Sequence, residues 1–456
     1  MQERIREYLR DVARRKGRSI DVGLIGYGTT NTAILEAVNE CDFIHRIRVR
    51  HSGTPCAPPY REIELICGRD ALTDITEDVV FASPSVRREN LGIKGSTAVT
   101  SDTDIFFIDP PENLFLVSGS DGKSTVTTLA SLLLSPTFPH LFTGGNLGTP
   151  VASASISSNA FLLELSSFNL RYITPKSRRA LLTNVTPNHL DWHRDLREYE
   201  ECKARLIRTA REAVIPLSCP FNERLVKGMS SFALVSTAHS DRQLRAQYNT
   251  RHTVTLEDGM IRIDGEEILA ADEIAMKEEH NVENLMSAIA LSLGYAARER
   301  IREVARDFRG LEHRCHRINR GGKEYVDSSI DTTPERTKTT LTSLGKRVHL
   351  ILGGRGKGLS PDTMRDALIK YALSISLYGE VASDIDTWLG DDTELSKIPR
   401  RRFARLSDAI DHADGLAEGG GTVLLSPSAT AYGEFANYRA RGEFFENYIA
   451  KKHGQI

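Results

Sequence analysis

Residues 119–124, a glycine-rich segment, have the composition of a phosphate-binding loop. The segment lies between an apolar run, ENLFLVS, and a helical pattern, TVTTLASLLL. Backbone N–H groups at a helix N-terminus attract anions, Lys123 adds a positive charge, and the Ser124 hydroxyl can reach Mg²⁺. The usual form of this loop has one more glycine, where this chain has Val117. The segment predicts ATP binding by Gly119, Ser120, Asp121, Gly122, Lys123, Ser124 and Thr125.

The elements around this loop recur along the chain. Residues 20–28, IDVGLIGYG, are an apolar run that enters a glycine turn, and a third alternation begins near Lys323. Alternating strands and helices predict parallel sheets, which place ligands at the carboxyl ends of their strands. The predicted fold is α/β with three domains: a Rossmann-like domain over 1–101, a P-loop-type ATPase sheet over 102–309 and a Rossmann-like domain over 310–456.

The first glycine turn, Gly26-Tyr27-Gly28-Thr29-Thr30-Asn31, admits two interpretations. A dinucleotide fingerprint would prefer glycine at position 31 and an acidic residue near the end of the next strand, where this chain has Arg48-Val49-Arg50. This sequence argues against NAD, although an arginine accommodates the phosphate of NADP. The turn also suits another nucleotide, and one glycine turn does not decide between the two.

Composition excludes several classes of protein. Lys+Arg and Asp+Glu number 59 and 61, so the chain lacks the overall basic charge that drives nucleic-acid binding. The six cysteines show no CxxC pair and no metal-type spacing with histidine, which predicts reduced, cytosolic thiols. The first 20 residues contain no continuous apolar stretch, so we expect neither a signal peptide nor a membrane anchor. The expectation is a cytoplasmic monomer that acts on small molecules, without nucleic acid or stable membrane association.

The phosphate-binding loop is the first of a series of short motifs. After GSDGKST come GGNLGTP (144–150), LELSSFNL (163–170), NVTPNHLDWH (184–193), YEECK (199–203), EEHNVEN (278–284), FRGLEHR (308–314), VDSS (326–329), GGRGKG (353–358) and LSPSATAYGEFANYRARGEFF (425–445). In this order they resemble the motifs of the Mur ligases, ATP-dependent amide-bond ligases of peptidoglycan synthesis, over most of the chain. Within that family they are most similar to the branch that adds D-glutamate to a UDP-muramoyl precursor.

The resemblance implies two Mg²⁺ sites. Ser124 and Glu164 would hold the Mg²⁺ that bridges the ATP phosphates, and His189 would bind a second Mg²⁺. Lys203 matches the lysine that CO₂ carbamylates in this family, which turns a cation into a metal-bridging anion. Without the resemblance, a strand-end glutamate is more often an ion-pair partner, a loop histidine is usually solvated, and Lys203 would count as a surface lysine.

The remaining site residues also follow from the resemblance. Asn281, Arg314 and Asp327 match positions that contact the adenine and the phosphate or ribose side of ATP, and the rigid guanidinium of Arg314 suits a phosphoryl group in transfer. Asn281 and Asn284 are otherwise candidate helix caps. The UDP-substrate is expected at Gly28, Thr29, Thr30, Asn146 and Ser166. The amino-acid substrate is expected at Lys357, Thr332, Ala431 and Tyr438.

The chain departs from the family pattern at both substrate sites. Arg50 stands where an acidic uridine contact is usual, and Ser85 where glycine is usual. Four substitutions affect the amino-acid site: Ser329 for lysine, Asp331 for threonine, Ala431 for serine and Tyr438 for phenylalanine. A carboxylate at 331 would repel a dicarboxylic substrate, unless a shift of one residue puts Thr332 in the threonine position. Lys357 favours an acidic substrate, so D-glutamate, L-glutamate and a neutral amino acid all stay open.

These assignments predict a ligase that works through an acyl phosphate. The carboxylate of UDP-N-acetylmuramoyl-L-alanine attacks the γ-phosphate of ATP, and the amine of D-glutamate then displaces phosphate. Two Mg²⁺, Lys123 and Arg314 neutralise charge while a closing C-terminal domain aligns the amine. Alternatives are another amino acid, a relative of folylpolyglutamate synthetase, an ATPase or small-molecule kinase, and a non-catalytic ATP-binding relative. The joint presence of both metal-site residue sets argues against the last alternative.

Overall fold

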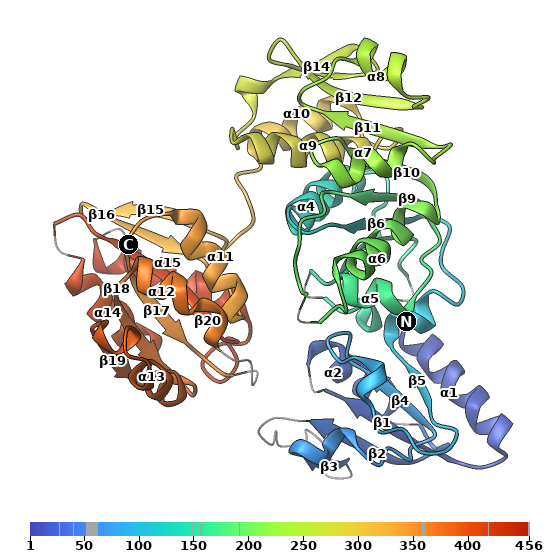
Figure 1. Cartoon of the computed structure of the whole chain (residues 1–456), viewed down its shortest axis with the longest axis horizontal. Coiled ribbons are helices and arrows are strands. Elements are labelled where there is room, and N and C mark those ends of the chain that lie inside the picture. The colour runs from blue at the N-terminus through green and yellow to red at the C-terminus, as the bar shows by residue number, and fades with distance from the viewer. Residues whose placement is uncertain are drawn as a thin grey trace. The chain divides into compact units, whose positions relative to one another are not determined.

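The computed structural model describes residues 1–454 apart from 27, 40, 52–62, 148, 156, 191, 357–360 and 418. The chain forms two compact units, unit 1 (Met1–Arg309) and unit 2 (Gly310–Ile456). Unit 1 contains a five-stranded and a nine-stranded sheet, and unit 2 a six-stranded sheet (Figure 1). The predicted α/β class is confirmed. The predicted three-domain division stays a prediction, because its boundary at residue 101 lies inside unit 1.

The five-stranded sheet has the order β3-β2-β1-β4-β5, and all its strands are parallel. The strands are β1 (Ile20–Ile25), β2 (Ile44–His51), β3 (Ile63–Cys67), β4 (Val79–Ala82) and β5 (Ala98–Thr100). Helices α1 (Gln2–Lys16) and α2 (Thr29–Val38) bury apolar residues against it. From β1 the chain adds β2 and β3 on one side of this strand, and it later adds β4 and β5 on the other side. This reversal creates a crevice at the carboxyl ends of β1 and β4, where ligands of such sheets bind.

The nine-stranded sheet has the order β14-β13-β12-β11-β10-β9-β6-β8-β7. Strands β6 to β12 are parallel, and β12 to β14 form an antiparallel meander. The strands are β6 (Leu114–Ser118), β7 (Leu141–Gly145), β8 (Ala160–Glu164), β9 (Ser177–Leu182), β10 (Ala210–Pro216), β11 (Phe232–Ser236), β12 (His252–Glu257), β13 (Met260–Ile263) and β14 (Glu266–Ala270). The central strands β6, β8 and β11 are buried along their whole length, as parallel strands covered on both faces require.

Helices cover both faces of this second sheet. One core joins α4 (Lys123–Leu134), α9 (Glu279–Leu291) and α10 (Arg298–Asp307) to one face, and another joins α5 (Ser167–Tyr172), α6 (Leu196–Arg208) and α7 (Pro220–Val226) to the other (Figure 1). The short helices α3 (Asp102–Phe106) and α8 (Asp241–Gln247) complete unit 1. The carboxyl ends of β6, β8 and β9 therefore lie next to the first turns of α4 and α5. The motifs of unit 1 converge at this edge.

Unit 2 has one sheet with the order β15-β16-β20-β17-β18-β19, parallel except for β15. Its strands are β15 (His316–Arg320), β16 (Lys323–Asp327), β17 (Val348–Gly353), β18 (Ala372–Tyr378), β19 (Arg400–Phe403) and β20 (Thr422–Ser428). Its helices are α11 (Pro334–Leu344), α12 (Arg365–Tyr371), α13 (Ala382–Asp391), α14 (Leu406–Leu416) and α15 (Tyr438–Lys452), which bury apolar residues on both faces. Among the described residues of both units, no helix is long and apolar enough to cross a membrane.

Candidate active site

The phosphate-binding loop connects β6 to α4 and depends on two glycines. Gly119 has φ 149° and Gly122, the N-cap of α4, has φ 78°, values that side-chain-bearing residues rarely adopt. A Cβ atom at Gly119 would overlap the Thr183 hydroxyl, and one at Gly122 would overlap the Asn284 amide. The loop is thus packed against the end of β9 and against α9. This close approach leaves its backbone N–H groups at the start of a helix, as an anion site requires.

The segment that follows β9 holds this loop in place. The Ser120 N–H donates to the Asn184 carbonyl at 2.8 Å, and the Asp121 N–H donates to the Asn184 side-chain oxygen at 2.9 Å. The Ser120 hydroxyl accepts from the Thr186 N–H and lies 2.7 Å from the Tyr199 hydroxyl. Lys123 Nζ donates to the Ser120 carbonyl at 2.7 Å, so its positive charge lies over the loop. The Ser120 hydroxyl therefore connects the loop to α6 and to the segment after β9.

Glu164 ends β8 and is 1% exposed. Its Oε2 accepts from the Ser124 hydroxyl at 2.8 Å, and its Oε1 accepts from the Asn146 amide at 3.0 Å. Among the described residues, no lysine or arginine nitrogen forms an ion pair with it. A buried carboxylate that meets only neutral donors is costly unless a cation joins it. Glu164 and Ser124 supply the oxygen ligands that Mg²⁺ prefers, so the pair fits a phosphate-bridging metal.

Lys203 is buried rather than at the surface, with 2% of its area exposed. It lies on α6, and Nζ donates to the Gly119 carbonyl at 2.6 Å and lies 4.7 Å from the centre of the Tyr199 ring. Burial, followed by the nearby charge of Lys123, lowers the pKa of Lys203 well below its usual value. A neutral amine is the nucleophilic form of lysine, and CO₂ reacts with that form. Burial therefore gives this lysine the chemistry that carbamylation needs.

His189 belongs to an exposed loop between β9 and α6. Its backbone is left-handed with φ 54°, and its ring centre lies 4.9 Å from that of Phe168. His193 in the same motif is buried, with Nε2 2.9 Å from the Ser167 hydroxyl, and burial lowers its pKa to about 4. Trp192 donates to the Ser85 carbonyl at 2.9 Å, which ties this loop to the five-stranded sheet. His189 offers an accessible imidazole, whereas His193 is structural.

Asn281 and Asn284 lie one turn apart on α9, and neither caps that helix. Glu278 is the N-cap, without a side-chain cap hydrogen bond, and Asn281 donates to its carboxylate at 3.1 Å. Asn284 is nearly buried and borders Gly122 of the phosphate-binding loop. The contact of Asn281 with adenine stays a prediction. Asn284 supports the loop, a role that sequence reasoning missed because nothing in its local pattern points to Gly122.

The crevice between β1 and β4 is braced by Asn31. Its amide, which is buried, donates to the Ile25 and Gly26 carbonyls at 2.9 and 2.7 Å and to the Phe81 carbonyl at 3.4 Å. Asparagine at this position therefore ties the two strand ends together, a task that glycine could not perform. Gly28, the N-cap of α2, and the first helical residues Thr29 and Thr30 follow.

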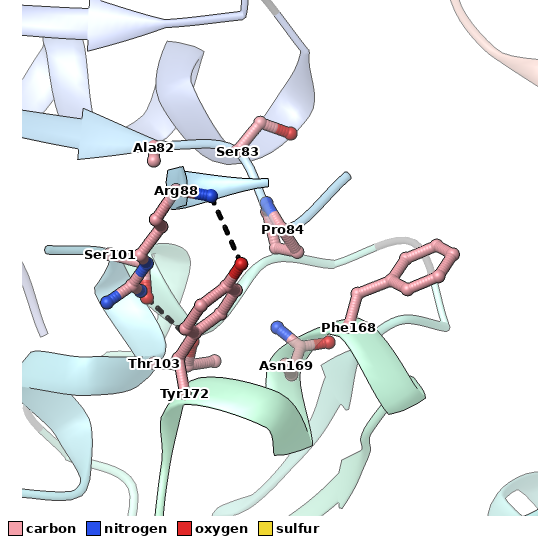
Figure 2. Close-up of a pocket in the computed structure, with 9 residues that line it drawn as sticks. All are labelled: Ala82, Ser83, Pro84, Arg88, Ser101, Thr103, Phe168, Asn169 and Tyr172. Carbon is pink, nitrogen blue, oxygen red and sulfur yellow. Dashed lines mark hydrogen bonds between the residues drawn. The ribbon is translucent and has the colours of Figure 1, made fainter. Parts of the chain in front are cut away.

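A small pocket lies next to this crevice (Figure 2). Ser83 and Pro84 line it from the segment after β4. Asn169 and Tyr172 line it from α5, which packs against the nine-stranded sheet. The Tyr172 hydroxyl accepts from the Arg88 N–H at 3.1 Å, which connects the two walls. The predicted contact Ser166 lies beside this wall and caps α5, where its hydroxyl donates to the Asn169 side chain at 2.6 Å. The UDP-substrate contacts stay predictions.

Arg50 is bonded within the five-stranded domain. It is buried on β2 and its Nε donates to the buried Glu77 carboxylate at 2.7 Å, while Nη1 donates to the Ala71 and Thr73 carbonyls. Arg48 donates to Glu64 at 2.8 Å. Both guanidinium groups that would have accommodated an NADP phosphate are thus paired with carboxylates of their own sheet.

Comparisons with known proteins agree with this arrangement. Residues 117–292 match the Mur ligase middle domain. The UDP-N-acetylmuramoylalanine–D-glutamate ligase of Acetivibrio thermocellus is 32% identical over 387 residues, which are 82% of this chain and 82% of that protein. The chain belongs to the Mur ligase family.

Two further comparisons extend over nearly the whole chain. A protein of the same name from Ruminiclostridium cellulolyticum is 28% identical over 98% of this Mur ligase family member and 99% of its own length. Among solved structures, the UDP-N-acetylmuramate-alanine ligase MurC of Thermotoga maritima covers 95% of this chain and 100% of its own, with a TM-score of 0.53 and 16% identity. The latter likeness concerns the fold.

In unit 2 of this Mur ligase family member, Asp327 ends β16 and is fully buried. Its Oδ2 lies 2.6 Å from His313 Nδ1, and its Oδ1 accepts from the Ser329 N–H at 2.8 Å. Arg314 follows His313 and is exposed. The predicted contacts of Asp327 and Arg314 with ATP stay predictions.

The substituted amino-acid site of unit 2 is internally bonded. The Asp331 carboxylate accepts from the Thr340 and Ser426 hydroxyls at 2.7 and 2.8 Å and is buried. The Ser329 hydroxyl donates to the Tyr438 carbonyl at 2.7 Å and accepts from Arg441 Nε at 2.9 Å. Thr332 is half-buried beside Asp331, Ala431 is buried, and Lys357 lies outside the described residues.

Proposed function

We propose that this Mur ligase family member uses ATP to join D-glutamate to UDP-N-acetylmuramoyl-L-alanine. The names of the relatives that match 82% and 98% of the chain support this activity. The observation that carries the ATP-dependent part is the buried Glu164 carboxylate, which meets the Ser124 hydroxyl directly behind the phosphate-binding loop. An anion at this position serves a metal–nucleotide complex and would otherwise oppose phosphate binding.

The proposed reaction has two steps. A carboxylate oxygen of UDP-N-acetylmuramoyl-L-alanine attacks the γ-phosphorus of ATP, the bond to the β-phosphate oxygen breaks, and ADP leaves. The D-glutamate amine then attacks the acyl carbon, loses a proton, and inorganic phosphate leaves. Mg²⁺, when bound, would screen the phosphate charges. Lys123 and the backbone N–H groups at the start of α4 orient the phosphates, and Arg314 is proposed to neutralise charge on the transferred group.

Lys203 is proposed to carry a carbamate. Its neutral amine would attack CO₂, forming an N–C bond and releasing a proton, so that a buried neutral group becomes an anion. Its position 2.6 Å from the Gly119 carbonyl and its lowered pKa support this step. We propose that the carbamate and His189 serve a second Mg²⁺.

The internal bonds of unit 2 give Asp331 a structural role, which leaves an acidic amino-acid substrate open. An unbound carboxylate at this position would oppose a dicarboxylic substrate, but this carboxylate is buried and accepts from two hydroxyl donors. Thr332 follows it and is the proposed amino-acid contact, together with Lys357, Ala431 and Tyr438. L-Glutamate on the same scaffold is the second candidate, because Ser329 does not supply the charge of the usual lysine.

Each sheet would have its own share of the substrate binding. Residues 1–101 would bind the UDP part through Gly28, Thr29 and Thr30, and Asn146 and Ser166 of the second sheet would be further contacts. Residues 102–309 would bind ATP, and residues 310–456 the amino acid. The enzyme would act in the cytoplasm as a monomer on these small molecules.

The deciding experiment is phosphate release from ATP and Mg²⁺ in the presence of UDP-N-acetylmuramoyl-L-alanine. D-Glutamate, L-glutamate and a panel of other D- and L-amino acids are supplied one at a time. Turnover with D-glutamate alone is the expected result. Turnover only with another amino acid would retain the ligase and change its specificity, and release without any amine would indicate an ATPase.

A further inference from the structure

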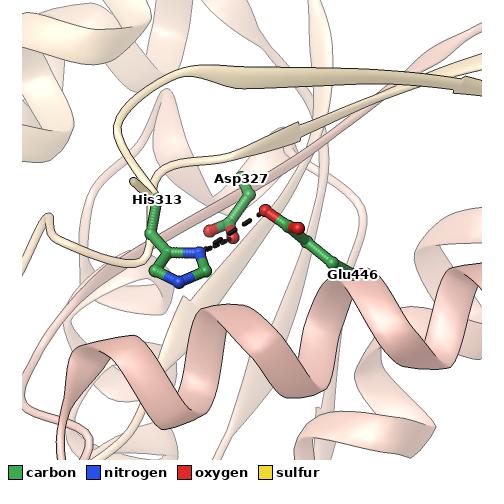
Figure 3. A group of neighbouring side chains, drawn as sticks. All are labelled: His313, Asp327 and Glu446. Carbon is green, nitrogen blue, oxygen red and sulfur yellow. Dashed lines mark hydrogen bonds and ion pairs between the residues drawn. The ribbon is translucent and has the colours of Figure 1, made fainter. Parts of the chain in front are cut away.

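An ion-pair network in unit 2 joins three elements that are distant in sequence (Figure 3). His313 precedes β15, Asp327 ends β16, and Glu446 lies on α15. His313 Nδ1 lies 2.6 Å from Asp327 Oδ2 and 3.5 Å from Glu446 Oε1. His316 Nδ1, on β15, approaches the same Glu446 oxygen at 2.8 Å. Glu446 thus forms ion pairs with two histidines on either side of Arg314.

The backbone around Arg314 is strained. His313 has φ 56° and Cys315 has φ 52°, so a left-handed residue lies immediately before and immediately after Arg314. Residues other than glycine adopt this conformation rarely, and it is unfavourable unless surrounding contacts impose it. The turn therefore needs an external restraint to keep its shape.

Helix α15 supplies that restraint through two neighbouring turns. Gly442 lies so close to His313 that an added Cβ would overlap the imidazole ring, and Glu446 lies one turn further along the helix. Burial alone lowers the pKa of His313, but the hydrogen bonds to Asp327 and Glu446 outweigh it and raise the pKa to about 10. The His313 imidazolium is the common partner of both carboxylates, and His316 is a second partner of Glu446. These groups form one ion-pair network.

We propose that Glu446 is a positioning residue of the ligase: by bonding His313 it holds the strained turn that presents Arg314 and keeps the Asp327 carboxylate fixed. Glu446 itself touches no substrate. This role rests on the proposed function, because it assumes that Arg314 neutralises the transferred phosphoryl group. Misplacing such a group by about 1 Å costs on the order of a hundredfold in rate.

The first test compares Glu446→Gln with Glu443→Gln, which removes an exposed carboxylate one turn earlier on α15. We expect Glu446→Gln to lower kcat by about 10- to 100-fold with little change in KM for UDP-N-acetylmuramoyl-L-alanine, because charge neutralisation acts in the transition state. Glu443→Gln should retain the activity of the unaltered enzyme. Equal activity of all three proteins would overturn the proposal.

A double-mutant cycle separates positioning from a general loss of structure. Glu446→Gln is measured in the unaltered enzyme and in an Arg314→Ala background. If Glu446 acts through Arg314, its removal should change the residual rate by less than about twofold once Arg314 is absent. A loss of equal size in both backgrounds would mean that Glu446 supports the fold alone, and the proposal would fail.

A third measurement does not depend on ligase activity. NMR titration of the His313 imidazole should show a protonated ring at pH 8 in the unaltered protein and in Glu443→Gln, and a lower pKa in Glu446→Gln. The charged groups that face this ring are Asp327, Glu446 and, through Glu446, His316. An unaltered His313 pKa in Glu446→Gln would show that Glu446 does not interact with His313, and the proposal would fail. An enzyme without ligase activity but with the expected titration would refute the proposed function and retain the network.

Discussion

At the scale of single residues, burial decides the chemistry of the proposed ATP site. Glu164 and Lys203 are opposite in charge and both nearly inaccessible to water. Glu164 meets neutral donors and retains its need for a cation, whereas Lys203 loses its proton readily because burial and Lys123 lower its pKa. Their positions on a strand end and on a helix gave no local sign of this difference.

Lys203→Ala is expected to abolish most of the ligase activity. The variant lacks the amine that CO₂ modifies, so bicarbonate added to CO₂-depleted buffer should restore the unaltered enzyme and leave the variant inactive. Phosphate release with all three substrates measures both. Full activity of Lys203→Ala would exclude the carbamate from the mechanism.

Gly122→Ala should prevent the phosphate-binding loop from forming. The added Cβ would meet the Asn284 amide on a backbone with φ 78°, and such strain costs about 1–3 kcal/mol. ATP affinity, measured by isothermal titration, should fall strongly. Gly228→Ala is the matched control, because a Cβ there meets nothing within 4 Å. Comparable ATP affinity of both variants would contradict the role given to Gly122.

Among the secondary-structure elements, two buried ion-pair groups join strands to segments that are distant in sequence. Arg50 on β2 pairs with Glu77 before β4, and the network of His313 joins β16 to α15. Such pairs are strongly destabilising when one partner is removed, because the other charge stays buried. Removing one partner therefore tests whether a charged residue stabilises the fold or binds a ligand.

Arg50→Ala is expected to destabilise unit 1 by about 3 kcal/mol, because it leaves Glu77 buried with Arg48 at 3.8 Å as its remaining ion-pair partner. Urea denaturation measures the loss. Arg46→Ala on the same strand removes an exposed guanidinium 3.7 Å from Glu64 and should cost at most about 1 kcal/mol. A variant at position 50 that keeps its stability and changes only KM for the UDP-substrate would return Arg50 to the nucleotide site.

The His313 network predicts a pH-dependent contribution to the stability of unit 2. The pKa of His313 rises from 6.5 to about 10 on folding, so its contribution is complete below pH 6.5 and is lost as the pH rises to about 10. Differential scanning calorimetry should show a higher Tm for the unaltered protein than for Glu446→Gln near neutral pH. This difference should disappear above about pH 10. A constant difference in Tm up to that pH would contradict the linkage.

At the scale of the whole molecule, the groups proposed for catalysis are divided between two compact units. Glu164 and Lys203 belong to unit 1, and Arg314 and Asp327 belong to unit 2. Unit 2 has its own sheet and two apolar cores. Each unit therefore contains the packing that an independent fold requires, but neither contains the complete set.

A fragment of residues 310–456 is expected to fold alone and to be inactive. Far-UV circular dichroism should show a cooperative thermal transition, because the cores of unit 2 are complete. The fragment of residues 1–309 should bind ATP without joining substrates. An unfolded C-terminal fragment would show that unit 2 depends on unit 1 for its stability.

The sequence by itself determined the α/β class and the phosphate-binding loop of this Mur ligase family member. Both depend on patterns within a few consecutive residues, such as a buried strand, two glycines and a helical repeat. The order of its motifs also indicated the family. All of these features follow the order of residues along the chain, so the sequence is sufficient to find them.

Which charges are buried, and with which partners, depends on the tertiary structure. Glu164 with Asn146, Arg50 with Glu77, and Asp331 with Ser426 are pairs whose members lie apart in the sequence and meet through the sheets. Glu446 escaped sequence reasoning for the same reason, because its partner His313 is 133 positions earlier. The electrostatic free energy of a group depends on its surroundings in space, and the chain sequence specifies these only through the fold.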